Sequence, residues 1–362
     1  ILEYVLDALV DAGMERLVLV VGYRRARVQE HFGPDYREVP IEYVHQHKQL
    51  GSGHALLQAR NAVSGPTLVV NGDHLVEARA VRAVADAFAA GNQAATVAVI
   101  ERDDASRYGA VTLENGDIAE IVEKPDTDEY RLINAGIYAF DEAIFGQIEA
   151  TPRDAGELAL TDTIARLVET GRVGAVRVGG LWVDATYPWD LLAVTSAVLE
   201  RGHVSEPERA DGIRVAAEAN VHEDAILRPP VAIAADAAIG PGSVVGPRVA
   251  IGRNATLGAN VTVEHSLLDG DTRVGHGATL VDTVCGEGVT VGVDVSVPGG
   301  PADVRVDRQV FRDRQLGAVL ADRVEVGGAA TLVPGTLVGP GATVETGVTA
   351  DGRVPENGRV VR

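Results

Sequence analysis

The sequence predicts an α/β domain with a mostly parallel sheet, followed by a domain built as a parallel β-solenoid. Two patterns predict this fold class: strand-like and helix-like segments alternate in the first half, and aliphatic residues recur at every sixth position in the second half. The aromatic residues support the division, because fourteen of the fifteen lie at or before Trp189 and only Phe311 follows. The second half must therefore build its core from small and branched residues.

The domain boundaries follow from this change of composition. A stretch rich in charged residues, with a proline and a glycine, separates the two patterns and is typical of a connection between domains. We expect the first domain at 1–205, a linker at 206–218, the solenoid at 219–349 and a C-terminal tail at 350–362.

The first domain is predicted to be a Rossmann-like series of βαβ units. Apolar residues at helical spacing predict an opening helix, and the continuous apolar run after it predicts a strand buried on both faces. Functional residues of such sheets lie at the carboxyl ends of the strands. The expected elements are a helix at 4–10, a strand at 17–22, a helix at 28–32, a strand at 41–44, a helix at 54–62 and a strand at 67–70.

A six-residue period governs the second half. It fits neither a helix nor a flat strand, but it fits a solenoid with three faces of six residues per coil. Nineteen positions follow it, which gives about six coils and a prism roughly 30 Å long. The period slips by one residue before Leu268 and again before Cys285, and 298–319 interrupts it as a projecting loop. The pattern resembles the left-handed parallel β-helix of hexapeptide-repeat acyltransferases.

The charge balance excludes several classes of function. The formal net charge is −20, so the chain lacks the basic face that nucleic acids or anionic membranes require. Lys48 and Lys124 are the only lysines, and this acidic, lysine-poor composition favours a salt-adapted cytoplasm, although a GC-rich genome would also favour arginine. The single cysteine, Cys285, excludes a disulfide framework, and no apolar run is long enough to span a bilayer. We therefore expect a cytoplasmic protein.

Residues suited to nucleotide and metal binding occur in the first half. Gln46 precedes a turn that contains Gly51 and Ser52, where the backbone can approach a flat ring and the glutamine amide can pair with a pyrimidine edge. Asp73 follows the predicted strand at 67–70, and a carboxylate at the carboxyl end of a strand can hold Mg²⁺. Asp184 ends a Trp-Val-Asp segment about 110 residues later. Each motif alone also fits an ordinary turn, helix cap or surface residue.

Further motifs lie between the two aspartates. Glu123 and Lys124 precede a proline, and a lysine presents a compact charge to a phosphate. Gly109 lies in a Tyr-Gly-Ala-Val segment, and Asn134 opens an Asn-Ala-Gly-Ile-Tyr segment. In this order the motifs resemble the sugar-1-phosphate nucleotidylyltransferases. With the solenoid, they resemble the bifunctional type that makes UDP-N-acetylglucosamine, particularly its archaeal members.

The resemblance implies a reaction and a role for each motif. The reaction is transfer of a nucleotidyl group from UTP or dTTP to a sugar 1-phosphate, either glucose 1-phosphate or N-acetylglucosamine 1-phosphate, with release of pyrophosphate. The segment 157–162 also matches the family, and we interpret it as structural. The implied contacts are Gln46, Gly51 and Ser52 to the base, Gly109, Glu123 and Asn134 to the sugar, Lys124 to its phosphate, and Asp73 and Asp184 to Mg²⁺.

The family opens with a strand and a glycine-rich loop that carries an arginine and, shortly after it, a lysine. That loop cradles the triphosphate through backbone N–H groups. Here the sequence begins at Ile1 rather than Met, already inside a helix-like pattern, so we expect that the loop is missing from this stretch, with its absence from the protein as the second case. The second case favours an alternative function, a non-catalytic ligand-sensing or scaffold subunit of the same architecture.

The solenoid carries a segment that resembles an acetyltransferase site. The resemblance implies that His276, with Asp282 after it, is the general base on a sugar amine that attacks acetyl-CoA. The family has a tyrosine where Thr279 stands and an asparagine in the segment matching 296–300, and neither occurs here, so acetyl transfer is a second alternative. The resemblance also implies a homotrimer formed through the solenoid. Arginines of the projecting loop that could bind CoA phosphates are Arg305, Arg308, Arg312 and Arg314.

Overall fold

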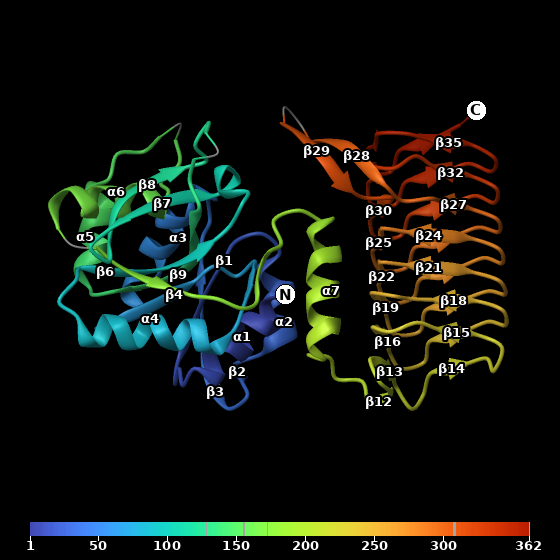
Figure 1. The fold of residues 1–362 in the computed structure, drawn as a ribbon, viewed down its shortest axis with the longest axis horizontal. Coiled ribbons are helices and arrows are strands. Elements are labelled where there is room, and N and C mark those ends of the chain that lie inside the picture. The colour runs from blue at the N-terminus through green and yellow to red at the C-terminus, as the bar shows by residue number, and fades with distance from the viewer. Residues whose placement is uncertain (128, 155, 172, 307–308, 362) are drawn as a thin grey trace. The chain divides into compact units, whose positions relative to one another are not determined.

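The described chain forms two compact units (Figure 1), Ile1–Asp184 and Ala185–Arg362. No helix in the described ranges is long and apolar enough to cross a membrane. The structure, a computed structural model, describes residues 1–127, 129–154, 156–171, 173–306 and 309–361.

The first unit is an α/β domain, which confirms the predicted class. It contains a sheet of order β1-β3-β2, a larger sheet of order β4-β9-β6-β10-β8-β7, and a two-stranded ribbon of β5 and β11. Its strands are β1 (Leu17–Val21), β2 (Asp35–Tyr36), β3 (Val39–His45), β4 (Thr67–Val70), β5 (His74–Val76), β6 (Ala95–Glu101), β7 (Gly109–Glu114), β8 (Asp117–Glu123), β9 (Leu132–Phe140), β10 (Val173–Arg177) and β11 (Trp182–Asp184). Its α-helices are α1 (Leu2–Asp11), α2 (Arg25–Phe32), α3 (Ser52–Gln58), α4 (Ala78–Ala90), α5 (Ala143–Ala150) and α6 (Leu160–Thr170).

The larger sheet is mixed, which corrects the expectation of a mostly parallel sheet. Its parallel pair is β6 with β10, whereas β9 runs antiparallel to β4, β6 and β7. The β7–β8 hairpin turns at Asn115 and Gly116, both with positive φ, as a two-residue antiparallel connection requires. Alternation of strands and helices does not report strand direction, whereas this Asn-Gly pair does.

Strand β9 forms the centre of the first unit. Every residue from Leu132 to Phe140 is buried, because β9 lies between β4 and β6 and is covered on both faces. Asn134 therefore sits on one of the most firmly packed elements of the domain. One face of β9 packs with α4 through Ile133 and Ile137, and the other contributes Tyr138 and Phe140 to a separate apolar cluster.

The second unit is a helix, α7 (Asp190–Arg201), and a parallel β-solenoid with three faces. The first face stacks β12 (Glu208–Ala210), β13 (Ile213–Val215), β16 (Val231–Ile233), β19 (Val249–Ile251), β22 (Ser266–Leu268), β25 (Thr283–Cys285), β30 (Ala318–Leu320), β33 (Thr336–Val338) and β36 (Arg353–Val354). The second stacks β14 (Asn220–Val221), β17 (Ala238–Ile239), β20 (Thr256–Leu257), β23 (Arg273–Val274), β26 (Thr290–Val291), β31 (Glu325–Val326), β34 (Thr343–Val344) and β37 (Arg359–Val360). The third stacks β15 (Ile226–Leu227), β18 (Val244–Val245), β21 (Thr262–Glu264), β24 (Thr279–Val281), β27 (Ser296–Val297), β32 (Thr331–Leu332) and β35 (Thr349–Ala350).

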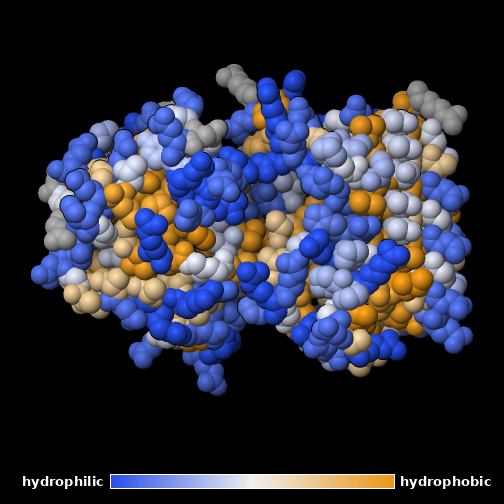
Figure 2. Space-filling model, in the orientation of Figure 1, coloured by the Kyte–Doolittle hydropathy of each residue, from blue (hydrophilic) through white to orange (hydrophobic). Residues whose placement is uncertain are grey.

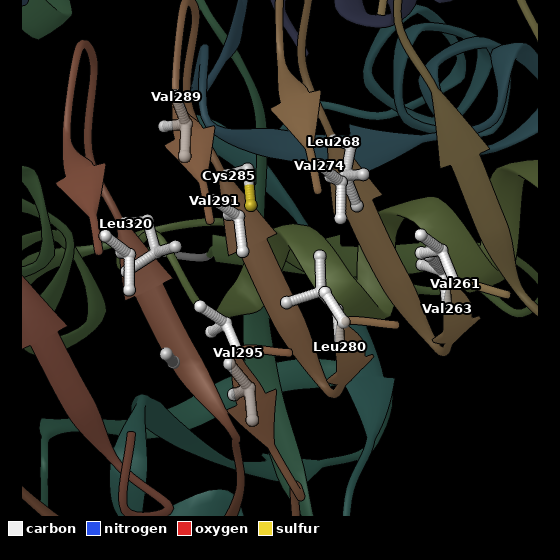
Figure 3. Packing of buried hydrophobic residues seen from close by; sticks show 14 of the residues in the cluster. Val261, Val263, Leu268, Val274, Leu280, Cys285, Val289, Val291, Val295 and Leu320 are labelled. Carbon is white, nitrogen blue, oxygen red and sulfur yellow. The ribbon is translucent and has the colours of Figure 1, made fainter. Parts of the chain in front are cut away.

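The periodic aliphatic residues point into this solenoid, as predicted. Figure 3 shows Leu268, Leu280 and Leu320 among the inward side chains that fill the prism. Cys285 lies in the same core, and burial raises the pKa of its thiol to about 12, so it stays protonated. The predicted projecting loop is the antiparallel hairpin of β28 (Pro301–Val306) and β29 (Gln309–Gln315).

The observed boundaries differ from the expected ones. Strands β12 and β13 lie within the expected linker, and β13 pairs with β16 of the next coil, so this segment starts the solenoid. Strands β36 and β37 continue the coils through the expected tail. Helix α7 belongs to the second unit, because Trp189, just before it, packs against Phe311 and Leu316. The aromatic count placed the boundary too late, because Tyr187 and Trp189 serve the second unit's core.

The face of the molecule drawn in Figure 2 is largely hydrophilic. Figure 2 shows hydrophilic side chains covering much of the visible face of each unit, with apolar columns between them on the solenoid. Two large apolar side chains of the solenoid, Ile226 and Val293, are 53% and 50% exposed.

Candidate functional site

The structure brings the two predicted aspartates together. Strand β11 pairs antiparallel with β5, so that Asp184 lies opposite His74, and Asp73 immediately precedes β5. Ligand atoms of Asp73, His74 and Asp184 all lie within 4.8 Å of one another. Two carboxylates and an imidazole at this spacing fit a divalent cation, because they supply oxygen and nitrogen ligands that converge on one point.

His74 is a member of this cluster that the motifs did not identify. Its Nε2 lies 3.8 Å from Asp73 Oδ1 and 3.9 Å from Asp184 Oδ1. The side chain is largely buried, and its Nδ1 lies 3.2 Å from the carbonyl oxygen of Ala135. The only sequence signal for His74 was its position directly after Asp73. In a regular strand, however, neighbouring side chains point to opposite faces, so this position alone does not predict that His74 joins Asp73.

The segments around Asp73 and Asn134 pack against each other through Gly136. This glycine has φ +72°, and a Cβ there would collide with His74 Nδ1 and approach the Asn71 amide. The N–H of Asn71 also donates to the Gly136 carbonyl, at 3.0 Å. A glycine is therefore required at this position for the backbone to come this close to the aspartate cluster.

The three residues assigned to the sugar lie together. A Cβ on Gly109 would be 3.2 Å from Glu123 Oε2 and 3.7 Å from Asn134 Cβ, so the glycine leaves an open space between them. Asn134 is held in place on both sides of its amide. Its Nδ2 donates to the Tyr138 hydroxyl at 2.6 Å, and its Oδ1 accepts the N–H of Gly136 at 3.0 Å. Burial raises the pKa of Tyr138 to about 12, so its hydroxyl stays neutral.

Lys124 directly follows β8 and is exposed. Its backbone is in the left-handed region with φ 44°, and its N–H donates to the Tyr108 carbonyl at 3.0 Å. This bond joins the end of β8 to the start of β7, where Gly109 lies. The turn therefore fixes the backbone of Lys124 beside Gly109, one of the amino acids assigned to sugar binding, while the lysine side chain is exposed to solvent.

The segment assigned to the base is a rigid turn. Gln46 Nε2 donates to the Gly51 carbonyl at 3.3 Å and lies 2.9 Å from His54 Nδ1. Gly51 has φ +96°, and a Cβ there would collide with the Leu158 carbonyl. Ser52 Oγ accepts the N–H of Leu160 at 3.0 Å, at the start of α6. The backbone of 157–162 thus supports the turn, which agrees with its structural interpretation.

A cavity of about 590 Å³ lies between β1 and β4. Each of these strands is the edge of its own sheet, and all residues of both strands line the cavity. Most of the lining is apolar, but Ser52, Asn71 and Gly72 reach it, so the cavity opens toward both the base turn and the aspartate cluster.

The two residues of the segment that resembles an acetyltransferase site, His276 and Asp282, have different hydrogen-bond partners. The exposed ring of His276 accepts the N–H of Ala259 on Nδ1 at 2.7 Å, so this nitrogen is engaged with the backbone of the preceding coil. Asp282 is buried beside His265 instead. Of the loop arginines, Arg308 lies outside the described residues.

Comparisons with known proteins place this geometry in a family. The nucleotidyl transferase family model matches residues 1–201, and a model described as the GMPPB C-terminal domain matches 226–354. A protein named "Bifunctional protein GlmU" from Methanococcus maripaludis strain S2 is 30% identical over 356 residues, covering 94% of this chain and 84% of that protein. "UTP--glucose-1-phosphate uridylyltransferase AglF" from Haloferax volcanii is 37% identical over 194 residues, covering 52% of this chain and 80% of that protein.

Two further similarities agree with this placement. "Low-salt glycan biosynthesis nucleotidyltransferase Agl11" from Haloferax volcanii is 33% identical over 314 residues, covering 83% of this chain and 87% of that protein. The crystal structure of a "Putative Glucose-1-Phosphate Thymidylyltransferase" from Bacillus anthracis matches with a TM-score of 0.51 at 23% identity, covering 57% of this chain and 84% of that one, and supports the fold. The family model spans more than half of the chain, and the chain belongs to the nucleotidyl transferase family.

Proposed function

We propose that this protein transfers a nucleotidyl group from UTP or dTTP to a sugar 1-phosphate and releases pyrophosphate. The observation that carries the proposal is the convergence of Asp73 and Asp184, from separate strands, at a spacing that fits one divalent cation. The similarity to AglF makes UTP and glucose 1-phosphate the first pair to test.

The reaction needs few groups from the protein. A phosphate oxygen of the sugar 1-phosphate attacks the α-phosphorus of the nucleotide, and the bond to the β-phosphate oxygen breaks as pyrophosphate leaves. Asp73 and Asp184 would hold Mg²⁺, which neutralises charge on the triphosphate and the leaving group when bound. Lys124 would hold the attacking phosphate in line, and Gly109, Glu123 and Asn134 would hold the sugar.

The base would lie against the turn that contains Gly51 and Ser52. The glycine at position 51 lets the backbone of Leu158 pack directly against the turn, which holds the turn in one conformation. The Gln46 amide lies at the same turn and is held by Gly51 and His54, so its orientation is fixed before the base arrives. Such preorganisation lowers the entropy that binding costs.

We further propose that the cavity between β1 and β4 accepts one more β-strand, which carries the glycine-rich triphosphate loop of the family. Two facing strand edges have unpaired backbone groups, and an apolar slot between them offers burial on both faces. A protein extended upstream of Ile1 by such a strand should melt at a higher temperature than residues 1–362 alone. Equal melting temperatures, with equal protection of β1 and β4 amides from hydrogen exchange, would contradict this proposal.

We also propose that the protein is cytoplasmic and assembles as a homotrimer through its solenoid, as the resemblance of its six-residue repeat to hexapeptide-repeat proteins implies. Light scattering after size exclusion in concentrated KCl should give three times the 37.9 kDa of the chain. A monomeric mass at micromolar concentration would rule the trimer out.

The activity is tested by pyrophosphate release from the full-length protein in concentrated KCl. The panel crosses UTP, dTTP, ATP and GTP with glucose 1-phosphate, N-acetylglucosamine 1-phosphate and galactose 1-phosphate. We expect turnover with a pyrimidine nucleotide and dependence on a divalent cation. Absence of turnover across the panel, with a folded protein, would favour the non-catalytic alternative.

A further inference from the structure

His74 stands between the two carboxylates of the proposed cation site. Its Nε2 lies at nearly equal distances from them, 3.8 Å to Asp73 Oδ1 and 3.9 Å to Asp184 Oδ1. Both distances exceed the ~2.7–3.2 Å of a hydrogen bond. The imidazole therefore faces the carboxylates without bonding to either one.

The opposite nitrogen fixes the ring. Nδ1 lies 3.2 Å from the Ala135 carbonyl oxygen, which can only accept, so Nδ1 carries the proton and Nε2 presents its lone pair. Metal-bound histidines commonly donate their second ring N–H to a backbone carbonyl in this way. The site thus contains an oriented nitrogen donor in addition to two oxygen donors.

The surrounding residues keep the ring in this orientation. The Trp182 indole donates to the same Ala135 carbonyl at 2.9 Å, and its ring meets the His74 ring edge-on with centroids 5.2 Å apart. Gly136 closes the other side, since a Cβ there would collide with Nδ1. His74 is only 9% exposed, so it has little freedom to turn away.

The spacing is close to that of ligands on one ion. Adjacent ligands of an octahedral ion at ~2.1 Å are about 3.0 Å apart, and opposite ligands are about 4.2 Å apart. The separations at His74 fall between these values, so small side-chain movements bring all three groups onto one cation.

We propose that His74 Nε2 is a third protein ligand of the cation, and that it makes the site prefer Mn²⁺ or Co²⁺ over Mg²⁺. Imidazole suits transition metals, whereas Mg²⁺ prefers oxygen donors and retained water. This inference deepens the proposed function, because it rests on the same cation site. It concerns which ion the chain selects rather than which reaction follows.

The test is electron spin-echo modulation of Mn²⁺ added to the metal-free full-length protein, without nucleotide. A directly bound imidazole gives a ¹⁴N signal that oxygen ligands do not give. We expect this signal in the native protein and in the control His31→Gln, whose exposed ring lies beside Glu3 on the surface. We expect it to vanish in His74→Phe, which keeps a ring against Trp182.

Binding affinities provide the second readout. In His74→Phe and His74→Asn, the Kd of Mn²⁺ should rise by at least about tenfold, as loss of a metal-supporting group commonly does. The Kd of Mg²⁺ should change by less than about threefold, which would remove the preference. Near-ultraviolet circular dichroism shows whether each variant is folded. If a variant does not fold, the ¹⁴N modulation of Mn²⁺ in the native protein still tests the proposal.

The outcomes separate this inference from the proposed function. A native Mn²⁺ spectrum without ¹⁴N modulation, or unchanged Mn²⁺ affinity in folded His74 variants, would overturn the nitrogen ligand while pyrophosphate release stands. A clear ¹⁴N signal in a protein that releases no pyrophosphate would retain the ligand and reject the activity.

Discussion

His265 and Asp282 stack at the same corner of two successive coils, with His265 Nδ1 at 2.5 Å from Asp282 Oδ1. Asp282 is 3% exposed, and its second oxygen accepts the Gln315 side-chain amide at 2.7 Å and the Gly300 N–H at 3.1 Å. Gly300 directly precedes β28, and Gln315 is the last residue of β29. The buried carboxylate of Asp282 therefore bonds the segments at the start and the end of the hairpin to the coil that precedes it in sequence.

The first prediction is that Asp282→Ala destabilises the solenoid by about 1–3 kcal/mol, as removal of the acceptor of buried hydrogen bonds commonly does. The substitution leaves His265, Gln315 and the Gly300 N–H without their acceptor. Urea unfolding in constant KCl measures the change, and hydrogen exchange should locate the loss of protection in residues 300–317. Asp294→Asn, at an exposed left-handed corner, is the control and should change stability little.

The pH dependence has a defined sign. Burial would raise the pKa of Asp282, but the hydrogen bonds from His265, Gln315 and the Gly300 N–H outweigh it and hold the pKa below its ordinary value. The stabilisation from Asp282 is therefore present above the unfolded pKa of ~3.9 and is lost as the pH falls through the lower folded value. The stability gap between native protein and Asp282→Ala should shrink below about pH 4. A gap that grows on acidification would contradict the assignment.

The sequence predicted where the coils are irregular but not what the irregularity does. The two slips in the six-residue period fall at His265 and Asp282, where a single left-handed residue turns the corner and the coil takes 17 residues instead of 18. Which residues touch across coils depends on how two shortened corners stack. The six-residue period does not show that His265 stacks on Asp282, and the family resemblance implied a role for His276 rather than for His265.

In the first unit, too, several local elements were predictable from the sequence, whereas the contacts between distant segments were not. Strands β1, β3 and β4 and helices α1, α2 and α3 were predicted from residues close in sequence, whereas helices α4, α5 and α6 were not predicted. The pairing of β5 with β11 joins segments more than one hundred residues apart, and this pairing places His74 opposite Asp184. Motif order could associate the two aspartates, but only the register of that ribbon adds the histidine.

The second prediction concerns Lys124. Lys124→Ala should lower kcat/KM for the sugar 1-phosphate by about 10²–10³-fold, because the positive charge that holds the attacking phosphate is lost. Lys124→Arg keeps the charge and should retain intermediate activity, since the left-handed backbone at this position is unchanged. Steady-state kinetics with varied sugar 1-phosphate measure both. Native kinetics in Lys124→Ala would return this residue to an ordinary surface role.

The third prediction is that Asp73→Asn and Asp184→Asn each abolish turnover and leave the fold intact. A neutral amide binds a divalent cation more weakly than a carboxylate, and the two residues supply both charged oxygens of the cluster. Pyrophosphate release and far-ultraviolet circular dichroism are the measurements. Asp86→Asn, exposed on α4, is the control for removal of one negative charge. Substantial activity in either variant at low Mg²⁺ would show that the pair is misassigned.

The fourth prediction is that the protein requires salt for full stability. A net charge of −20 on a 37.9 kDa chain produces self-repulsion that dilute buffer does not screen. The melting temperature should rise steadily from 0.1 M to 3 M KCl. An unchanged melting temperature over this range would show that the acidic surface does not limit stability.

The last prediction is that acetyl transfer to glucosamine 1-phosphate is absent or very weak. General-base catalysis requires a free ring nitrogen, but His276 Nδ1 already accepts the Ala259 N–H, and Asp282 lies beside His265 rather than His276. The tyrosine and asparagine of the family are also missing, so nothing in the matching segments holds the amine near the thioester, which contributes several kcal/mol to such reactions. Free-thiol release from acetyl-CoA, measured with glucosamine 1-phosphate and galactosamine 1-phosphate, is the assay. A robust rate that disappears in His276→Ala would mean that the ring leaves Ala259 when substrate binds, and it would establish a second activity on the solenoid.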